Sequence, residues 1–161
     1  EAELGKFVSG LTIPPPLITD ILDKDVNEDY LAYLTTLHQK LEFCSKDELA
    51  RKSAALQDVE PELERLRLKA VSRVRDFLLS KFNQLRRPKT NIQILQQNVL
   101  LKYKNFVGFL KQHGPEVYPE IRSGYVDTMG RVYKSAVSSY VSSLSCIQQE
   151  VATRNDLIGV E

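Results

Sequence analysis

The chain has 161 residues, and its 42% apolar and 27% charged residues are typical of an ordinary globular domain. Lys and Arg (22) nearly balance Asp and Glu (21), which leaves a formal net charge of +1. This balance excludes a general attraction to nucleic acid or anionic membranes, so an electrostatic function needs a local patch. No run of 18 apolar residues occurs, and we expect no membrane-spanning helix.

Both ends of the sequence indicate a segment of a longer protein. The chain begins at Glu1 rather than Met, and it lacks the basic and apolar regions of a signal peptide. It stops at Glu161 without a tail. We therefore expect an internal fragment of a cytosolic protein.

The first 24 residues are expected to form a short helix and a proline-rich connector, followed by a main bundle at residues 25–161. Prolines 14–16 favour an extended connection, because each lacks an N–H and restricts the residue before it. The flanking residues Ile13 and Leu17 are apolar rather than basic. A rigid connector is therefore favoured over an SH3-type ligand.

Two long helices are expected next. The first is expected to begin after Asp25, because Glu28 follows three residues later as in a capping box. Apolar residues then recur at spacings of three and four from Tyr30 onward. Pro61 is expected to begin a new helix or to kink the old one, since an interior proline costs about 3 kcal/mol. The acids around Pro61 favour the start of the second helix, residues 61–85.

The apolar residues of the helix at 61–85 fall on an arc of roughly 160°. This arc is wider than the seam of a two-stranded coiled coil and predicts packing against two neighbours, as in a bundle. Its members are Leu63, Leu66, Ala70, Val71, Val74, Phe77, Leu78, Phe82 and Leu85.

Two further helices complete the expected fold. Pro88 prevents continuation of the second helix, and Asn91 is placed to cap a helix through Gln112. That helix is apolar almost all round, so we expect it to be the most buried. A last helix from about Pro119 to Asp156 carries a continuous apolar face.

No pattern of period two indicates a strand anywhere in the chain. The predicted fold class is therefore all-α. We expect an elongated antiparallel bundle of three to four long helices, formed by residues 1–161 as a single segment.

Residues for catalysis or metal binding are sparse. His38 and His113 accompany no nucleophile motif, and together with Cys44 and Cys146 they lack the spacing of metal ligands. The glycines form no phosphate-binding loop. We expect neither an enzyme nor a cofactor, and we interpret the two cysteines as buried, reduced thiols.

One local feature is a basic stretch at residues 65–89, with nine Lys or Arg residues and the single acid Asp76. The bases scatter around the helix, which is typical of a solvated face whose charges pair with acids of neighbouring helices. The alternative is a patch for an acidic partner or anionic lipid heads, and nucleic acid is not expected. Arg86, Arg87 and Lys89, at a corner between helices, are the candidate contact residues.

Tyrosines with helical spacing mark the last helix: Tyr118, Tyr125, Tyr133 and Tyr140. We interpret them as the edge of the core, with a binding platform as the alternative.

Three stretches, in this order and spacing, resemble the vacuolar protein sorting-associated protein 52 family, most closely its plant members. They are Leu66-Arg67-Leu68-Lys69-Ala70-Val71 leading to Arg75-Asp76-Phe77, then Leu100-Leu101-Lys102-Tyr103, and finally Asp156-Leu157-Ile158-Gly159-Val160-Glu161. Arg87-Pro88-Lys89-Thr90-Asn91 lies between the first two. The similarity runs from about Ile13 to the end of the chain.

The resemblance implies a segment of a subunit of the Golgi-associated retrograde protein complex and of its endosomal recycling counterpart. Such complexes tether endosome-derived vesicles at the trans-Golgi network or recycling endosomes. It implies a rod of the CATCHR type, shared with exocyst and COG, on the cytosolic face of these membranes. The implied partners are sibling subunits, SNARE proteins and small GTPases, and the resemblance assigns no contact to a numbered residue here.

Overall fold

A computed structural model describes residues 2–47, 53–87 and 91–151, and all the regular structure in these ranges is helical. The all-α prediction is therefore confirmed. The elements in chain order are α1 (Ala2–Leu11), α2 (Pro15–Asp23), α3 (Tyr30–Lys46), α5 (Ala54–Leu85), α6 (Ile92–Ile94), the π-helical turn η1 (Leu95–Leu100), α7 (Lys104–His113) and α8 (Tyr118–Val151).

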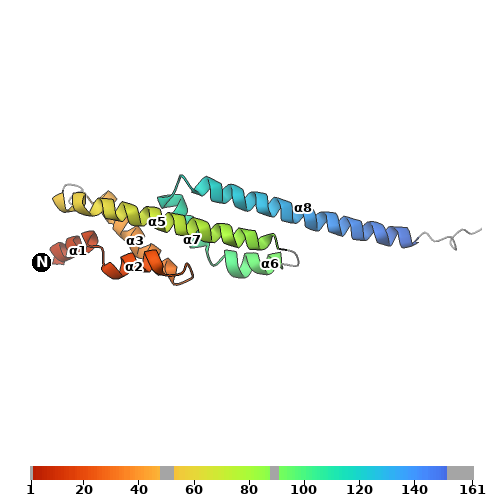
Figure 1. The fold of residues 1–161 in the computed structure, drawn as a ribbon, viewed down its shortest axis with the longest axis horizontal. Coiled ribbons are helices and arrows are strands. Elements are labelled where there is room, and N and C mark those ends of the chain that lie inside the picture. The colour runs from red at the N-terminus through yellow and green to blue at the C-terminus, as the bar shows by residue number, and fades with distance from the viewer. Residues whose placement is uncertain (1, 48–52, 88–90, 152–161) are drawn as a thin grey trace, which may run out of the picture.

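The molecule is an elongated bundle built around α5 (Figure 1). α1, α2 and α3 lie along the N-terminal part of α5, and α7 packs against its middle. α8 begins beside α5 and continues well beyond its end. Successive contacts between them, Arg75 with Glu120 and Phe82 with Tyr125, show that α5 and α8 run parallel. α3 and α7 each run antiparallel to α5, as expected for neighbouring helices.

The core forms where α2, α3, α5, α7 and α8 meet. Eight of the nine apolar residues predicted for the buried arc of α5 are buried, and Phe77 is half-buried. The arc faces several neighbouring helices, which explains its width. The central cluster also includes Leu17, Ile21, Leu34, Leu37, Phe106, Phe109, Leu110 and Ile121.

Buried polar contacts attach α2 to the bundle. The hydroxyl of Tyr30 donates to the carbonyl of Ile21 at 3.0 Å, and burial raises the pKa of Tyr30 to about 12. The guanidinium of Arg73 donates to the carbonyls of Ile21, Leu22 and Lys24. These carbonyls lie at the C-terminal end of α2, where a helix has no partners of its own. Arg73, one of the basic residues of the 65–89 stretch, therefore stabilises the packing of α2 against α5.

The proline-rich stretch connects two packed helices. α2 already begins at Pro15, because proline is tolerated in the first helical turn, where no N–H is needed. Leu17 and Ile21 of α2 belong to the central core. α3 begins at Tyr30 rather than just after Asp25, and its first turn is capped by Asn27, whose Oδ1 accepts from the Tyr30 N–H at 3.0 Å.

Pro61 lies inside α5, so the prediction that it begins a helix is wrong. Helix α5 begins at Ala54, with the hydroxyl oxygen of Ser53 accepting from the Ala55 N–H at 3.2 Å. The turn before Pro61 is retained by tertiary packing, since Leu56 forms a second small cluster with Leu11 of α1. Packing here outweighs the local cost of the proline.

The continuous helix predicted from Asn91 to Gln112 is also wrong. The segment forms α6, the π-helical turn η1 and, after a break, α7. Asn91 does act as a cap, because its Oδ1 accepts from the Ile94 N–H at 3.1 Å. Ile94 and Leu101 are exposed, so this segment is not the most buried helix.

Neither cysteine is fully buried, although both were expected to be. Cys44 is half-buried and Cys146 is exposed on α8, and both are free thiols. Within the described ranges, no helix is both long and apolar enough to cross a bilayer.

Candidate interaction surfaces

The first candidate surface is an apolar seam on the part of α8 that extends past α5. The seam consists of Tyr133, Val137, Tyr140, Leu144 and Ile147, whose side chains are between 47% and 65% exposed. Their spacing alternates strictly between four and three residues. This is the a/d repeat of a coiled coil, in which one helix offers a narrow stripe to one partner helix.

The surroundings of the seam are as unusual as the seam itself. Residues 135–149 contain no charged side chain, and serines occupy most of the remaining positions. A helix exposed to water normally carries charged residues on the side opposite its apolar stripe. Contiguous exposed apolar surface of this kind marks an interaction site. The seam therefore has the character of a helix surface that a second helix covers.

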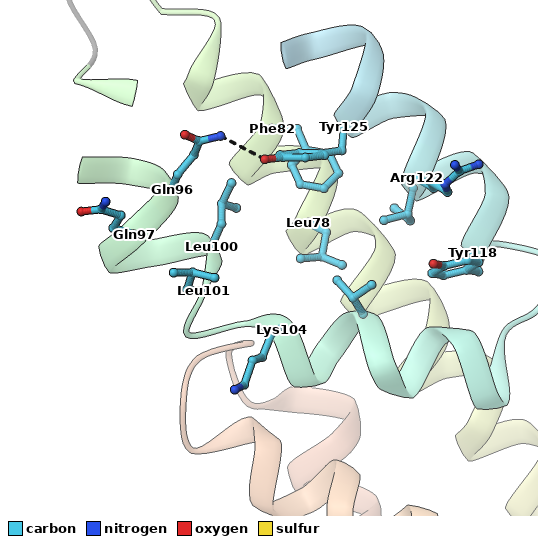
Figure 2. A pocket seen from close by; sticks show the side chains of 12 residues that line it. Leu78, Phe82, Gln96, Gln97, Leu100, Leu101, Lys104, Tyr118, Arg122 and Tyr125 are labelled. Atoms are coloured by element: carbon cyan, nitrogen blue, oxygen red, sulfur yellow. Dashed lines mark hydrogen bonds between the residues drawn. The ribbon is translucent and has the colours of Figure 1, made fainter. Parts of the chain in front are cut away.

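The second candidate surface is a groove of about 510 Å³ between α5, η1, α7 and α8 (Figure 2). The apolar lining comes from all four elements: Leu78, Phe82, Leu100, Leu101, Val107 and Ile121. The break between η1 and α7 creates the space, because η1 turns away from the line of α7 and leaves Leu100 and Leu101 on one wall.

Polar groups at the rim of the groove hold its walls together. Gln96 Nε2 donates to the hydroxyl of Tyr125 at 3.0 Å, which links η1 to α8. The ring of Tyr125 also packs against Phe82 of α5, with centroids 5.3 Å apart. Tyr118 and Tyr125 therefore line a groove edge, whereas Tyr133 and Tyr140 belong to the exposed seam.

Two cations, Lys104 of α7 and Arg122 of α8, lie at separate edges of the groove. No residue that lines the groove is acidic. Neither cation forms an ion pair within the described part of the chain, whereas Arg67 and Arg75 both do. The charge that faces the groove is therefore positive.

The structure brings together His38 and His113, which are 75 residues apart in the sequence. His38 Nδ1 lies 2.7 Å from His113 Nε2, so one ring donates a hydrogen bond to the other. Burial and the nearby positive charges of His38 and Arg67 lower the pKa of His113. In the described ranges, no group of three His, Cys, Asp or Glu side chains is placed to hold a metal ion.

The basic stretch is largely engaged by the fold. Arg75 pairs with Glu120 of α8 at 2.5 Å, and Lys81 lies 5.0 Å from the ring centroid of Phe77. Of the candidate corner residues, Arg86 and Arg87 are exposed just after α5, and Lys89 lies outside the described residues. Arg86 donates to the hydroxyl of Thr128 on α8 at 3.0 Å.

The sequence contains signals for both surfaces. The four-three spacing from Tyr133 is visible without a structure, within the continuous apolar face expected for the last helix. Lys104 and Arg122 have no acidic residue three or four positions away, which leaves each charge without a local partner on its helix. Their position beside one groove depends on the packing of α7 against α8.

Comparison with known proteins identifies the family. Residues 1–110 match the model described as "Vps52/Sac2 family, coiled-coil". The chain is 50% identical over 161 residues to vacuolar protein sorting-associated protein 52 A of Arabidopsis thaliana, covering 100% of this chain and 23% of the relative. It is 42% identical to the Homo sapiens homolog, covering 99% of this chain and 22% of the relative.

A more distant relative is vacuolar protein sorting-associated protein 52 of Saccharomyces cerevisiae, 27% identical over 91% of this chain and 25% of the relative. The chain thus spans about a quarter of the length of these relatives. No solved structure matches the chain. The whole of α8, including the seam, lies beyond the residues that the family model covers. From the match over residues 1–110, the chain belongs to the Vps52/Sac2 family.

Proposed function

We propose that the chain is a non-catalytic segment of a subunit of a multisubunit vesicle-tethering complex. The complex is the Golgi-associated retrograde protein complex, with its endosomal recycling counterpart, and it acts in transport from endosomes to the trans-Golgi network. The subunit works at the cytosolic face of these membranes as a peripheral component. Family membership and the names of the relatives as vacuolar protein sorting proteins support this proposal.

The observation that carries the proposal is the exposed seam on α8. A tether must be stiff along its length and must present surfaces to other subunits. The bundle around α5 supplies the stiffness, and α8 extends from it with an apolar a/d stripe. The occupant that fits this stripe is a long helix, and we assign it to a sibling subunit of the complex.

The remaining partners are SNARE proteins and small GTPases, which the bundle positions rather than modifies chemically. Binding of a helix along an apolar stripe needs no reaction centre, because burial of a few anchor side chains supplies most of the affinity.

The test is capture of the sibling subunits from cell extract by the full-length protein. One variant carries Val137→Asp and Leu144→Asp, which place two charges in the seam. Its matched control carries Ser138→Asp and Ser142→Asp, which add the same charge to exposed positions on the opposite side of α8. We expect recovery of the siblings to fall with the seam variant and to remain at wild-type level with the control. Unchanged recovery with the seam variant would refute the assignment of the seam.

A second candidate function is membrane or phosphoinositide binding through Arg86, Arg87 and Lys89. The exposure of Arg86 and Arg87 after α5 favours it. Sedimentation with liposomes that contain phosphoinositides tests it: salt-sensitive binding should be lost when the three residues are changed to Glu. If these changes leave liposome binding unaffected, this second candidate function is refuted.

A further inference from the structure

The groove between α5, η1, α7 and α8 is separate from the seam and is not needed for the tethering proposal. Its lining is mostly apolar, and Leu101 at its edge is 61% exposed to water. An apolar hollow open to water favours a partner that covers it. The question is which class of partner has a matching shape and charge.

The shape matches a helix. Three of the four walls are helices, so another helix can pack into the groove as an additional member of the bundle. On α8, the lining extends from Tyr118 to Tyr125, which is about 10 Å along a helix. An occupant therefore contacts the groove over about two turns, with apolar residues at positions i, i+3 or i+4, and i+7.

The charge matches an acidic partner. Lys104 and Arg122 come from different helices and lie at separate edges of the groove. Neither is paired with an acid among the described residues, and no lining residue is acidic. Carboxylates on either side of an apolar stripe would meet these two cations.

A lipid acyl chain fits less well. Small apolar ligands are usually enclosed over most of their surface, whereas this groove leaves Leu101 in contact with water. An amphipathic helix needs no such enclosure, because its outward side is polar.

We propose that this groove is a binding site for an acidic amphipathic helix of a partner protein. The apolar stripe of that helix packs on Leu100, Leu101 and Val107, and its flanking carboxylates pair with Lys104 and Arg122. The site is independent of the coiled-coil seam, so a protein can occupy both at once.

The test uses purified full-length protein and a fluorescein-labelled peptide of 18 residues. The peptide carries leucines at positions i, i+3, i+4 and i+7, flanked by glutamates, and a second peptide has glutamine in place of each glutamate. Fluorescence anisotropy is measured at low and high salt. We expect the acidic peptide to bind saturably and several-fold more tightly than the glutamine peptide, with the difference lost at high salt.

Matched variants separate the groove from general charge. Lys104→Glu with Arg122→Glu should weaken binding by about tenfold, since two attractions become repulsions. Lys111→Glu with Arg131→Glu makes the same change at exposed positions of the same two helices outside the groove, and it should leave binding unchanged. Leu101→Asp should weaken binding, whereas Leu68→Asp, at an exposed leucine outside the groove, should not.

Circular dichroism and thermal melting establish that each variant is folded as the wild type. Equal binding by the groove pair and its control would overturn the proposal. So would equal affinity for the two peptides, absence of saturable peptide binding, or binding of oleate in place of the peptide. These outcomes are independent of whether sibling subunits are captured through the seam.

Discussion

Both the first part of α8, up to Met129, and the second part, from Tyr133 onward, carry apolar residues at helical spacing, but different elements surround the two parts. In the first part, Ile121 is 2% exposed because α5 lies alongside, and Met129 is 6% exposed beside Gln96 of η1. In the second part, Val137 and Leu144 are exposed. α5 ends at Leu85, and Arg86, the next residue, is hydrogen-bonded to Thr128 of α8. An apolar stripe thus indicates that a helix has a partner, but not that the partner lies in the same segment of chain.

The largest expected effect comes from truncating the same residue type in each part. Ile121→Ala should lower the free energy of unfolding by about 2–5 kcal/mol, because it leaves a cavity in the core. Ile147→Ala should change it by less than about 0.5 kcal/mol, since the side chain is already in water. Urea unfolding followed by circular dichroism measures both, and equal losses would show that the comparison is wrong.

The boundary between the two parts can be tested at Thr128, which is 1% exposed and accepts a hydrogen bond from Arg86. Thr128→Val keeps the shape but removes the acceptor, and it should cost about 0.5–1.5 kcal/mol. A double-mutant cycle with Arg86→Ala should show coupling between the two changes. Strict additivity would mean that this hydrogen bond does not fasten α8 to the end of α5.

The smallest expected effect is that of low pH, which should destabilise the bundle without affecting the extended part of α8. The pKa of His113 is lowered by burial and by the charges of His38 and Arg67. The unfolded chain therefore takes up this proton at a higher pH than the folded one. The free energy of unfolding should fall as the pH decreases from about 6.5 through the folded pKa of His113, and it should be insensitive to His113 above that range.

Urea midpoints measured between pH 8 and pH 5 test this dependence. His113→Gln removes the titrating group and should flatten the slope, while hydrogen exchange should locate the loosening at α3 and α7, whose His38 and His113 meet. A slope that persists in His113→Gln would assign the acid sensitivity to other groups.

Much of the fold was predictable because helices have a period that side chains reveal. The buried arc of α5 was predicted almost residue by residue, since packing requires apolar residues on one side of a helix. Asn91 was recognised as a cap by its short polar side chain. The fold class followed from the same local patterns.

The groove was not predicted, and of the seam only Tyr133 and Tyr140 were named, as an alternative binding platform. Pro61 inside α5 and the break after η1 differ from the sequence-based predictions, because local propensities are small compared with the packing that Leu56 and α7 obtain from the rest of the chain. The placement of Lys104 and Arg122 at two edges of one groove depends on how α7 and α8 pack, and the contact of His38 with His113 joins helices far apart in sequence.

By itself, the sequence determined which segments are helical and which side of each helix is apolar, because both follow from neighbours within a few residues. Only the tertiary structure decided which apolar sides are covered. Coverage depends on where other helices end, and α5 ends before the stripe of α8 does. That mismatch in length leaves the seam exposed.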